Sequence, residues 1–361
     1  MIKVLFIVPN LETNGIARQA TRLAAGLGRE RFDVRICILG RSGPWEAKVA
    51  NAGVGIEKIG WTRPVDLRPI ARLVGVARSF RPHVIHAYGL AAMTAGVLVR
   101  LSAGGRLLLS SFAPGVPNGQ AASWRNRSLL RRANHIIAGG PCEASLAQEA
   151  GVSSTRIVKI RPAVGAVDPL PPPEVRESLG LPPDARLIAC IGPLEYRKGF
   201  YNAIWVCDIL RYVYDNFHLA FIGSGPDEAN LRRLVGRTQA ANHVHFLGWR
   251  EDVASILSEV DVVWAPSRGN TGINAVLEAM AAGRPVVAAR QPALAELVQD
   301  GVTGFLVPVN DQGAIARQTR QILDSPERAE RMGQAARQAV AASHAPASQI
   351  DAYARLYEDV A

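Results

Sequence analysis

Short β-branched, apolar segments alternate with helical segments twice along the chain, and this alternation constrains the fold more than any other feature. Helical apolar spacing occurs, for example, at 16–27 and 70–79. Strand–helix alternation is typical of βαβ units in a parallel sheet. We therefore predict an α/β fold of two doubly wound, Rossmann-like domains. The candidate strands are residues 3–9, 33–39, 83–87, 106–110, 135–138 and 156–160, then 186–191, 218–222, 243–247, 261–265, 285–288 and 304–307.

A proline-rich stretch separates the two series. Residues 162–183 contain seven prolines, three of them consecutive, and such segments act as stiff linkers. We expect an N-terminal domain over 1–165, a linker over 166–185 and a C-terminal domain over 186–345, with a helix at 346–361 packed back on the first domain. In open α/β sheets, ligands bind at the carboxyl ends of the strands. The ligand site is therefore expected in a cleft between the domains.

Positive charge is concentrated in the first half. Residues 1–165 hold 23 Lys and Arg against 8 Asp and Glu, a balance of +15, whereas the remainder has a balance of −5. This asymmetry indicates an anionic partner for the first half: nucleic acid, a membrane surface or an anionic acceptor. The segment 124–132 contains Trp124 and four arginines, which suits docking on anionic lipid, although a solvated helix explains it equally well. Nucleic acid is disfavoured because aromatic stacking platforms are lacking there.

Other sequence features limit the class of protein. No apolar run reaches the roughly 18 residues of a membrane-spanning helix, and the first residues read as a strand rather than a signal peptide. We expect a cytoplasmic protein, with peripheral association at the inner face of the membrane as the sharper alternative. The cysteines lack metal-ligand or disulfide-framework spacing, so neither a metal nor a disulfide is expected. They are Cys37, Cys142, Cys190 and Cys207.

Two glycine-containing turns follow candidate strands of the second half. Lys198 lies just before a helix that should begin at about Gly199, where an ammonium and backbone N–H groups can hold a phosphate together. The alternative is an ordinary solvated lysine. Gly223, Ser224 and Gly225 form the second turn, in which glycine permits close approach of a ligand to the backbone. A plain tight turn fits this pattern equally well.

The segment 265–285 carries the richest pattern. A polar, glycine-rich loop follows the strand, and a helix should begin near Gly272, where free N–H groups and the helix dipole attract an anion. Asn274 and Glu278 are four residues apart and share one face of that helix. A carboxylate in this position can accept hydrogen bonds from ribose hydroxyls.

These motifs resemble the group 1 (family 4 type) retaining glycosyltransferases of GT-B fold. The resemblance implies a GT-B architecture, transfer of a sugar from a nucleotide-sugar donor with retention, and no metal or other cofactor. The alternative of a dinucleotide-dependent oxidoreductase lacks its GxGxxG motif after the first strand. The segments that carry the resemblance are residues 8–15, 82–88, 244–253, 261–267, 277–287 and 300–308.

The resemblance also implies roles for individual residues. Lys198 and Arg197 would neutralise the donor diphosphate, Glu278 would bind the ribose, and residues near Phe246 would lie by the base. Asn14, Gly15 and Phe112 are the candidates on the acceptor side, and Asn270 is a candidate catalytic residue. The candidate nucleotide-sugar residues are Gly223, Ser224, Gly225, Phe246, Leu247, Thr271, Gly272, Ile273, Asn274, Leu277 and Glu278.

Several positions depart from the family pattern. Asn270 stands where a glutamate usually faces the donor sugar, Pro193 replaces an arginine, and Phe112 replaces a histidine. Asn14 replaces the first glycine of the acceptor-side loop, and His86 is interpreted as structural. We therefore consider two hypotheses: a glycosyltransferase acting on an acceptor such as a lipid-linked or cell-envelope glycan, and a nucleotide- or sugar-binding protein of the same fold with weak or lost transferase activity.

Overall fold

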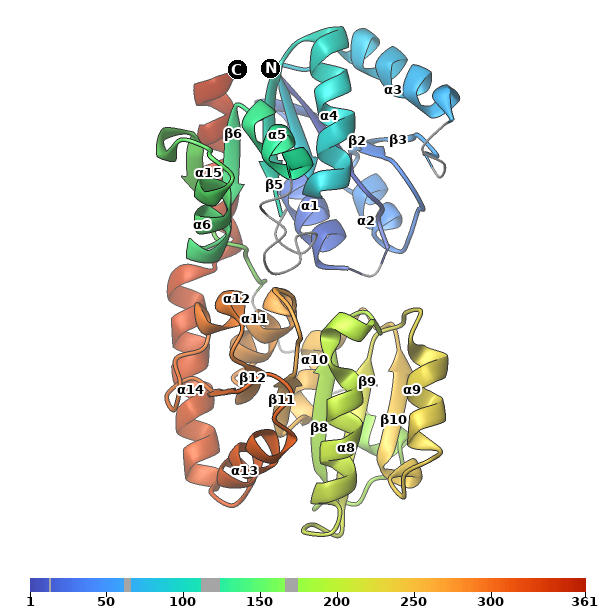
Figure 1. Cartoon of the computed structure of the whole chain (residues 1–361), viewed down its shortest axis with the longest axis vertical. Coiled ribbons are helices and arrows are strands. Elements are labelled where there is room, and N and C mark those ends of the chain that lie inside the picture. The colour runs from blue at the N-terminus through green and yellow to red at the C-terminus, as the bar shows by residue number, and fades with distance from the viewer. Residues whose placement is uncertain (13, 62–65, 112–123, 166–174) are drawn as a thin grey trace. The chain divides into compact units, whose positions relative to one another are not determined.

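The computed structural model describes residues 1–12, 14–61, 66–111, 124–165 and 175–361 (Figure 1). The chain divides into two compact units. Unit 1 comprises Met1–Pro162 and Pro346–Ala361, and unit 2 comprises Ala163–Ala345. The C-terminal helix thus belongs to unit 1. Each unit contains its own parallel sheet, as the alternation of strands and helices predicts.

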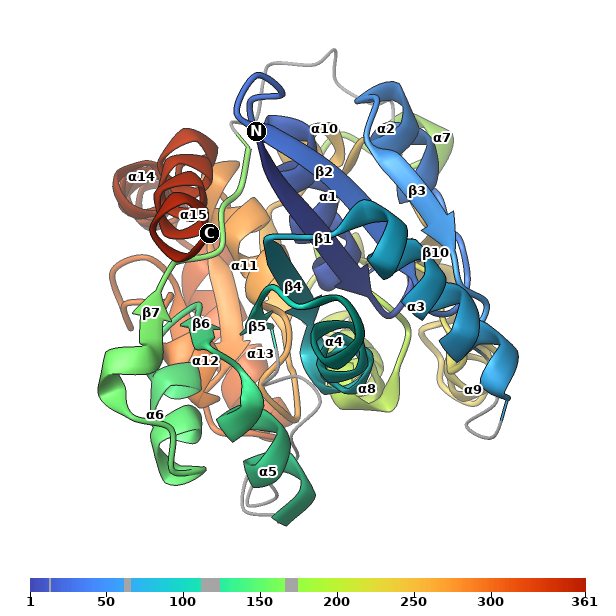
Figure 2. The same cartoon turned by 90° about the horizontal axis from the view of Figure 1, so that it is seen from above.

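The sheet of unit 1 has the strand order β3-β2-β1-β4-β5-β6-β7 within the described residues. Its strands are β1 (Ile2–Val8), β2 (Phe32–Ile38), β3 (Gly55–Lys58), β4 (Val84–Tyr88), β5 (Arg106–Ser110), β6 (His135–Ala138) and β7 (Ile157–Lys159). Its helices are α1 (Gly15–Gly26), α2 (Trp45–Asn51), α3 (Leu67–Phe80), α4 (Gly89–Ala103), α5 (Trp124–Arg132), α6 (Pro141–Glu149) and α15 (Pro346–Val360), with a 3₁₀ turn at Ser154–Arg156. Figure 2 shows α3 and α4 lying together beside β4.

Both faces of this sheet are covered, which explains why its central strands are almost continuously apolar. Leu5 and Ile7 of β1 pack with α3, α4, α5 and α6. Val4 and Phe6 point the other way and pack with α1, α2 and α15. Strand β3 was not predicted. It is a short edge strand in which only Ile56 is apolar, so its sequence gives little strand signal.

The sheet of unit 2 has the order β10-β9-β8-β11-β12-β13 within the described residues. Its strands are β8 (Arg186–Ile191), β9 (Phe217–Ile222), β10 (Val244–Gly248), β11 (Val262–Ala265), β12 (Val286–Ala289) and β13 (Phe305–Val307). Its helices are α7 (Val175–Ser178), α8 (Phe200–Leu210), α9 (Glu228–Val235), α10 (Val253–Glu259), α11 (Ile273–Ala281), α12 (Pro292–Ala295), α13 (Gln312–Leu323) and α14 (Pro326–Ser343), with 3₁₀ turns at Tyr196–Lys198 and Ala241–His243.

The described part of the predicted linker is packed into unit 2 rather than running freely between domains. Val175 and Ala185 are buried. Arg176 donates from its backbone to Glu259 Oε2 at 2.7 Å and from its guanidinium to the Glu259 carbonyl. A turn of helix therefore forms where the prolines suggested a spacer. Residues 166–174 lie outside the described part of the chain.

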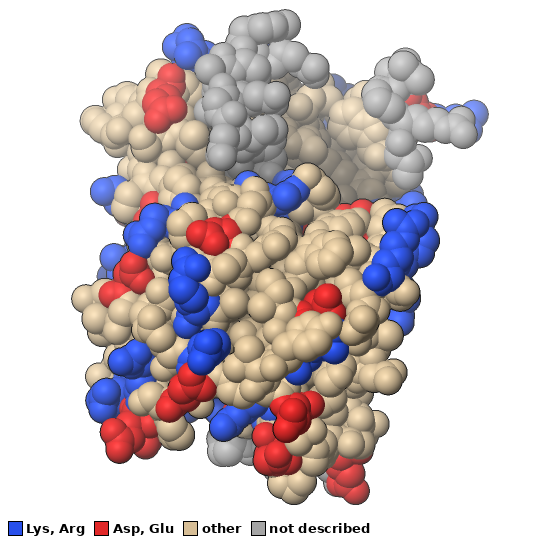
Figure 3. All heavy atoms as spheres, turned by 60° about the horizontal axis from the view of Figure 1, so that its bottom comes forward, with Lys and Arg blue, Asp and Glu red and all other residues tan. Residues whose placement is uncertain are grey.

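Surface charge and hydrophobicity vary along the molecule. On the face shown in Figure 3, basic and acidic side chains are interspersed rather than gathered in one patch. Among the helices of the described residues, none combines the length and the apolar character needed to cross a membrane.

Candidate functional site

Loops from four strands of unit 2 are joined by backbone hydrogen bonds at the carboxyl edge of its sheet. The Gly192 N–H donates to the Ile222 carbonyl at 2.9 Å, and the Gly223 N–H donates to the Gly248 carbonyl at 2.7 Å. The loop after β11 joins them through the Arg268 N–H, which donates to the Arg197 carbonyl at 2.8 Å. The predicted motifs of the second half are therefore brought to one edge, which is where ligands bind in such folds.

Two glycines of this edge are required by the backbone. Gly223 has a φ of 145°, and a Cβ there would overlap the Gly192 carbonyl. Gly199 has a φ of 70° and faces the Pro266 carbonyl so closely that a Cβ would overlap it too. These close approaches, which only glycine permits, keep the loops in contact.

Lys198 ends the 3₁₀ turn that precedes α8, and its side chain is partly buried against Gly192. Burial lowers the pKa of its ammonium to about 8, while the charges of Glu195 and Glu278 raise it in part. Within the described residues, no ion pair joins this ammonium to a carboxylate. Arg197 beside it points to Glu195, with which it pairs at 3.0 Å. A partly desolvated cation without a carboxylate partner is suited to hold an anionic ligand.

Helix α11 begins directly after the polar loop, as predicted. Gly272 precedes its first residue with a φ of 98°, and no side chain caps the helix. Its first N–H groups and the positive end of its dipole therefore favour an anion at this point. Asn270 in the same loop is buried, and its Oδ1 has no hydrogen-bond donor within the described residues. A ligand hydroxyl is one group that would satisfy it.

The remaining candidates on α11 divide into two groups. Glu278 is buried, and its charge acts on Lys198, so the structure brings these two predicted residues together. Asn274 and Thr271 are partly exposed. Leu277, by contrast, is fully buried in the core, and Ile273 packs against that core. The Leu277 side chain is therefore not available to a ligand, whereas Ile273 is partly exposed at the start of the helix.

Phe246 and Leu247 lie on β10, where the strand pairing shifts register. The Phe246 ring packs on Phe221, with ring centroids 5.1 Å apart, and the Arg232 guanidinium lies 4.2 Å from its centroid. Leu247 packs partly against the core. Because β10 pairs with β9, both residues lie near the Gly223 turn that follows β9.

The acceptor-side candidates belong to unit 1. The Asn14 side chain caps α1, since its Oδ1 accepts from the Ala17 N–H at 2.9 Å and its Nδ2 donates to Asn10 at 2.6 Å. Gly15 is the first residue of that helix. This cap explains why asparagine is suited to the position. Phe112 lies outside the described residues.

His86 has a structural environment, as interpreted from the sequence. Its ring is fully buried between β1 and α15. One ring nitrogen lies 2.6 Å from the Tyr357 hydroxyl and the other 2.9 Å from the Ser110 hydroxyl. Burial lowers the pKa of His86 to about 3, so the ring is neutral at physiological pH.

The proposed membrane segment forms α5, but part of it is used within unit 1. Leu130 is buried, and Arg131 donates to the Ala150 carbonyl at 3.1 Å. Arg127 and Arg132 are exposed. The side chains of Trp124 and Arg125 lie outside the described part of the chain.

Comparison with known proteins identifies the family. Residues 172–339 match the family described as Glycosyl transferases group 1, and residues 14–163 match the Glycosyl transferase 4-like domain. The two matches cover most of the chain. It belongs to the group 1 glycosyltransferases.

The chain is similar to proteins of several different functions. It is 29% identical over 181 residues to the lipopolysaccharide core biosynthesis glycosyltransferase LpsE of Rhizobium meliloti, covering 50% of this chain and 52% of LpsE. It is 27% identical over 307 residues to glycogen synthase of Mycobacterium tuberculosis, covering 79% of this chain and 72% of that protein. The match spans about half the length of LpsE and of EpsD of Bacillus subtilis.

Solved structures confirm the fold. HepE of Anabaena, in complex with UDP and glucose, superposes with a TM-score of 0.87 at 18% identity, covering 99% of this chain and 100% of HepE. Sucrose-phosphate synthase of Thermosynechococcus elongatus gives a TM-score of 0.79 at 20% identity, covering 100% and 99% of the two chains. The glycosyltransferase therefore has the predicted GT-B fold of two parallel-sheet domains.

Sequence reasoning missed two polar groups at the site of this glycosyltransferase. Ser267 is buried after β11, with its Oγ beside Gly272. Asp227 follows the Gly223 turn, and its buried Oδ2 has no hydrogen-bond donor within the described residues. Both directly follow glycine-rich or strand-end motifs, which is the signal that would have found them. Across the described residues, no group of three or more His, Cys, Asp or Glu is arranged to hold a metal.

Proposed function

We propose that this glycosyltransferase takes its sugar from a nucleoside-diphosphate sugar bound at the carboxyl edge of unit 2. The observation that carries the proposal is the partly buried Lys198 ammonium, which has no ion-pair partner in the described residues and lies on the same edge as the uncapped α11. Departure of a nucleoside diphosphate develops negative charge on the leaving oxygens, and preorganised cations and N–H dipoles stabilise it. The UDP and glucose bound to HepE support this assignment.

Each group at the edge has a distinct part in the proposed reaction. Lys198 and the first N–H groups of α11 hold the diphosphate, with Arg197 joining when it leaves Glu195. Glu278 accepts hydrogen bonds from the ribose, and the unsatisfied Oδ1 of Asn270 accepts one from the donor sugar. Transfer proceeds with retention at the anomeric carbon, and cationic groups of the chain rather than a metal neutralise the leaving group.

Removing the ammonium tests the donor site. Lys198→Ala is expected to weaken UDP binding by about 1.5–3 kcal/mol, or roughly 10- to 150-fold, the range for hydrogen bonds to charged groups. Lys159→Ala, an exposed lysine of unit 1, serves as the matched control. Titration calorimetry of the folded variants measures both. Unchanged UDP affinity in Lys198→Ala would show that the diphosphate does not bind at this edge.

A turnover measurement distinguishes an active transferase from a protein that only binds nucleotide sugars. The second candidate, a binding protein with weak or lost activity, is favoured by Asn270 at a position where the family usually has glutamate. Purified protein is given a panel of nucleotide sugars and glycan acceptors, with and without a chelator, and release of diphosphate is measured. Release that resists the chelator supports metal-independent transfer, and the anomeric configuration of the product tests retention. Nucleotide binding without any release favours the second candidate.

The acceptor is proposed to be a lipid-linked or cell-envelope glycan, reached by docking of unit 1 on anionic lipid. The similarity to LpsE, a glycosyltransferase of lipopolysaccharide core biosynthesis, and the exposed Arg127 and Arg132 of α5 support this. Each basic residue near an anionic surface contributes about 1 kcal/mol. Replacing Arg125, Arg127, Arg131 and Arg132 together should weaken salt-sensitive cosedimentation with anionic vesicles. If vesicles sediment without the wild-type protein at low salt, the acceptor is a soluble molecule.

A further inference from the structure

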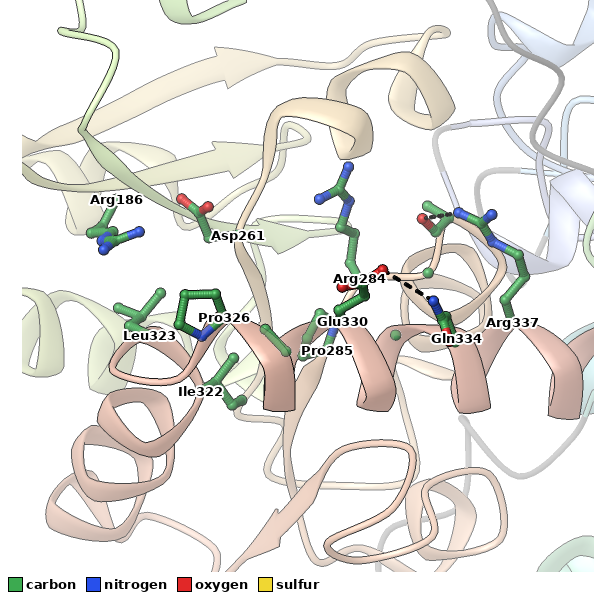
Figure 4. Close-up of a pocket in the computed structure, with 14 residues that line it drawn as sticks. Arg186, Asp261, Arg284, Pro285, Ile322, Leu323, Pro326, Glu330, Gln334 and Arg337 are labelled. Atoms are coloured by element: carbon green, nitrogen blue, oxygen red, sulfur yellow. Dashed lines mark hydrogen bonds between the residues drawn. The ribbon is translucent and has the colours of Figure 1, made fainter.

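A cavity lies at the edge of the unit 2 sheet opposite to the proposed donor site. Its volume is about 430 Å³. It is bounded by residues at the beginning of three strands, namely Arg186 on β8, Asp261 before β11 and Pro285 before β12, and by helix α14 (Figure 4). Cavities of this size accommodate small organic ligands.

Three arginines line this cavity: Arg186, Arg284 and Arg337. Figure 4 shows them spread along the cavity, with Arg186 near Asp261 at one end, Arg284 central and Arg337 of α14 at the other end. Within the described residues, none of the three forms an ion pair. The cavity is therefore lined by three arginines that have no ion-pair partner within the described residues.

Asp261, one of two acidic residues that line the cavity, is already engaged on one side. Asp261 accepts at Oδ2 from the Arg176 guanidinium at 3.0 Å and from the Leu187 N–H at 2.7 Å. Its other oxygen has no hydrogen-bond partner within the described residues. Glu330 on α14 accepts from Gln334 at 3.2 Å. The carboxylates are thus placed to accept further hydrogen bonds, and within the described residues neither forms an ion pair with the three arginines.

Arg284 carries a specific unsatisfied donor. Its Nη2 donates to the Ser258 carbonyl, whereas its Nε is buried and has no acceptor within the described residues. Burial lowers the pKa of its guanidinium, the negative charge of Asp261 raises it in part, and the positive charges of Arg337 and Arg176 lower it. An unsatisfied buried donor on a cation is costly, and an anionic ligand would remove that cost.

The cavity is built into the packing of unit 2. Gly333 of α14 packs so closely on the Gly283 carbonyl that a Cβ there would overlap it. Ile322, Leu323 and Pro326 provide an apolar wall on the α13–α14 side. The walls are therefore fixed by the core, and binding would require little reorganisation.

We propose that this cavity binds a small phosphorylated sugar. The guanidinium of Arg284, whose Nε lacks an acceptor within the described residues, supplies donors for the phosphate oxygens, and Arg186 and Arg337 add positive charge to the cavity. Asp261 Oδ1 and the Glu330 carboxylate accept from sugar hydroxyls, and the apolar wall packs on the carbon skeleton. The ligand binds outside the reaction site, and its binding does not depend on the proposed donor.

Titration of the full chain with inorganic phosphate, ribose and ribose 5-phosphate tests the proposal. Ribose 5-phosphate is expected to bind more tightly than phosphate, and ribose is not expected to bind. The variant Arg284→Gln should lose about tenfold or more in affinity, because its guanidinium contributes charge-assisted hydrogen bonds. Ala329→Phe, which fills the cavity and keeps its arginines, should lose binding as well.

Two controls fix the location of the site. Arg331→Gln removes an exposed arginine of α14 that does not line the cavity, and Lys198→Ala weakens the donor site. Both should leave the affinity for ribose 5-phosphate unchanged. The proposal is overturned if the wild type binds no ribose 5-phosphate at millimolar concentration, or if Lys198→Ala rather than the cavity variants abolishes binding. Equal affinity for phosphate and ribose 5-phosphate would overturn the assignment to a sugar.

Discussion

Replacing Lys198 with methionine should stabilise the ligand-free protein and, at the same time, weaken its binding of a nucleoside diphosphate. Burial lowers the pKa of this ammonium from 10.5 to about 8 despite the opposing charges of Glu195 and Glu278. One pKa unit corresponds to about 1.4 kcal/mol, so the charged lysine costs the folded state at most about 3 kcal/mol. Since the side chain is only partly buried, screening by water reduces the expected gain to about 1–2 kcal/mol.

The sign of the pH dependence follows from the lowered pKa of Lys198. Below about pH 8 the lysine is charged in both the folded and the unfolded chain, so the full penalty applies. Between about 8 and 10.5 the unfolded chain binds more protons, and the free energy of unfolding of the wild type rises with pH. The stability difference between Lys198→Met and the wild type should therefore be largest at pH 7 and shrink toward pH 10.

The affinity for UDP should change with pH in the opposite direction to the stability of the ligand-free protein. A diphosphate favours the charged ammonium, so UDP affinity should be constant below about pH 8 and fall by up to tenfold per pH unit above it. Lys198→Met should bind more weakly and lose this dependence.

Urea titrations at pH 7 and pH 10 and UDP titrations over the same range measure both effects, with Lys159→Met as the control. A Lys198→Met protein that is less stable than the wild type at pH 7 would refute the reasoning, because it would show that the ammonium is compensated in the ligand-free fold.

Three further substitutions test other parts of the molecule. Gly199→Ala should destabilise unit 2 by about 2 kcal/mol or more, since left-handed backbone costs about 1–2 kcal/mol and the Cβ meets the Pro266 carbonyl; a urea titration that shows no loss contradicts the close packing of these loops. Tyr357→Phe should cost about 1–3 kcal/mol by leaving the buried His86 ring nitrogen unsatisfied, and unchanged stability would show that this hydrogen bond is dispensable. Asn270→Glu should raise diphosphate release if only this departure weakens transfer, whereas a fall would show that Asn270 serves a different donor sugar.

The sequence pattern was informative about elements and less so about their edges. Every predicted strand is present, because buried parallel strands are apolar runs bounded by turn residues. Strand β3 escaped detection because an edge strand needs little apolar sequence. The prolines of 162–183 predicted a linker, but the sequence did not indicate that Val175 and Ala185 are buried. Burial of such short segments depends on which neighbours the fold brings to them, and spacing alone does not contain that information.

The candidate site, too, could be predicted from the sequence only in part. Lys198, Gly223 and the start of α11 could be placed from the sequence because each follows a strand directly and so reaches the same edge of the sheet. The orientation of Leu277 could not, since an apolar residue on an apolar helix fits either a ligand or the core. The lack of a hydrogen-bond donor to Asn270 Oδ1 within the described residues could not be predicted either, since it depends on which groups the fold places around that atom.

Unsatisfied groups at both edges of unit 2 connect stability with proposed binding. At the carboxyl edge, Lys198 is partly desolvated without an ion-pair partner in the described residues, and at the amino edge the buried Arg284 Nε has no acceptor there. Helix α11 links the two, since it begins after Gly272 at the first and ends before Gly283 at the second, with its apolar face fixed in the core. Each uncompensated cation lowers the stability of the ligand-free fold, a cost that persists where function requires it. Because a ligand that supplies the missing anion recovers this cost, the same two positions should give the largest ligand-dependent gains in the stability of unit 2.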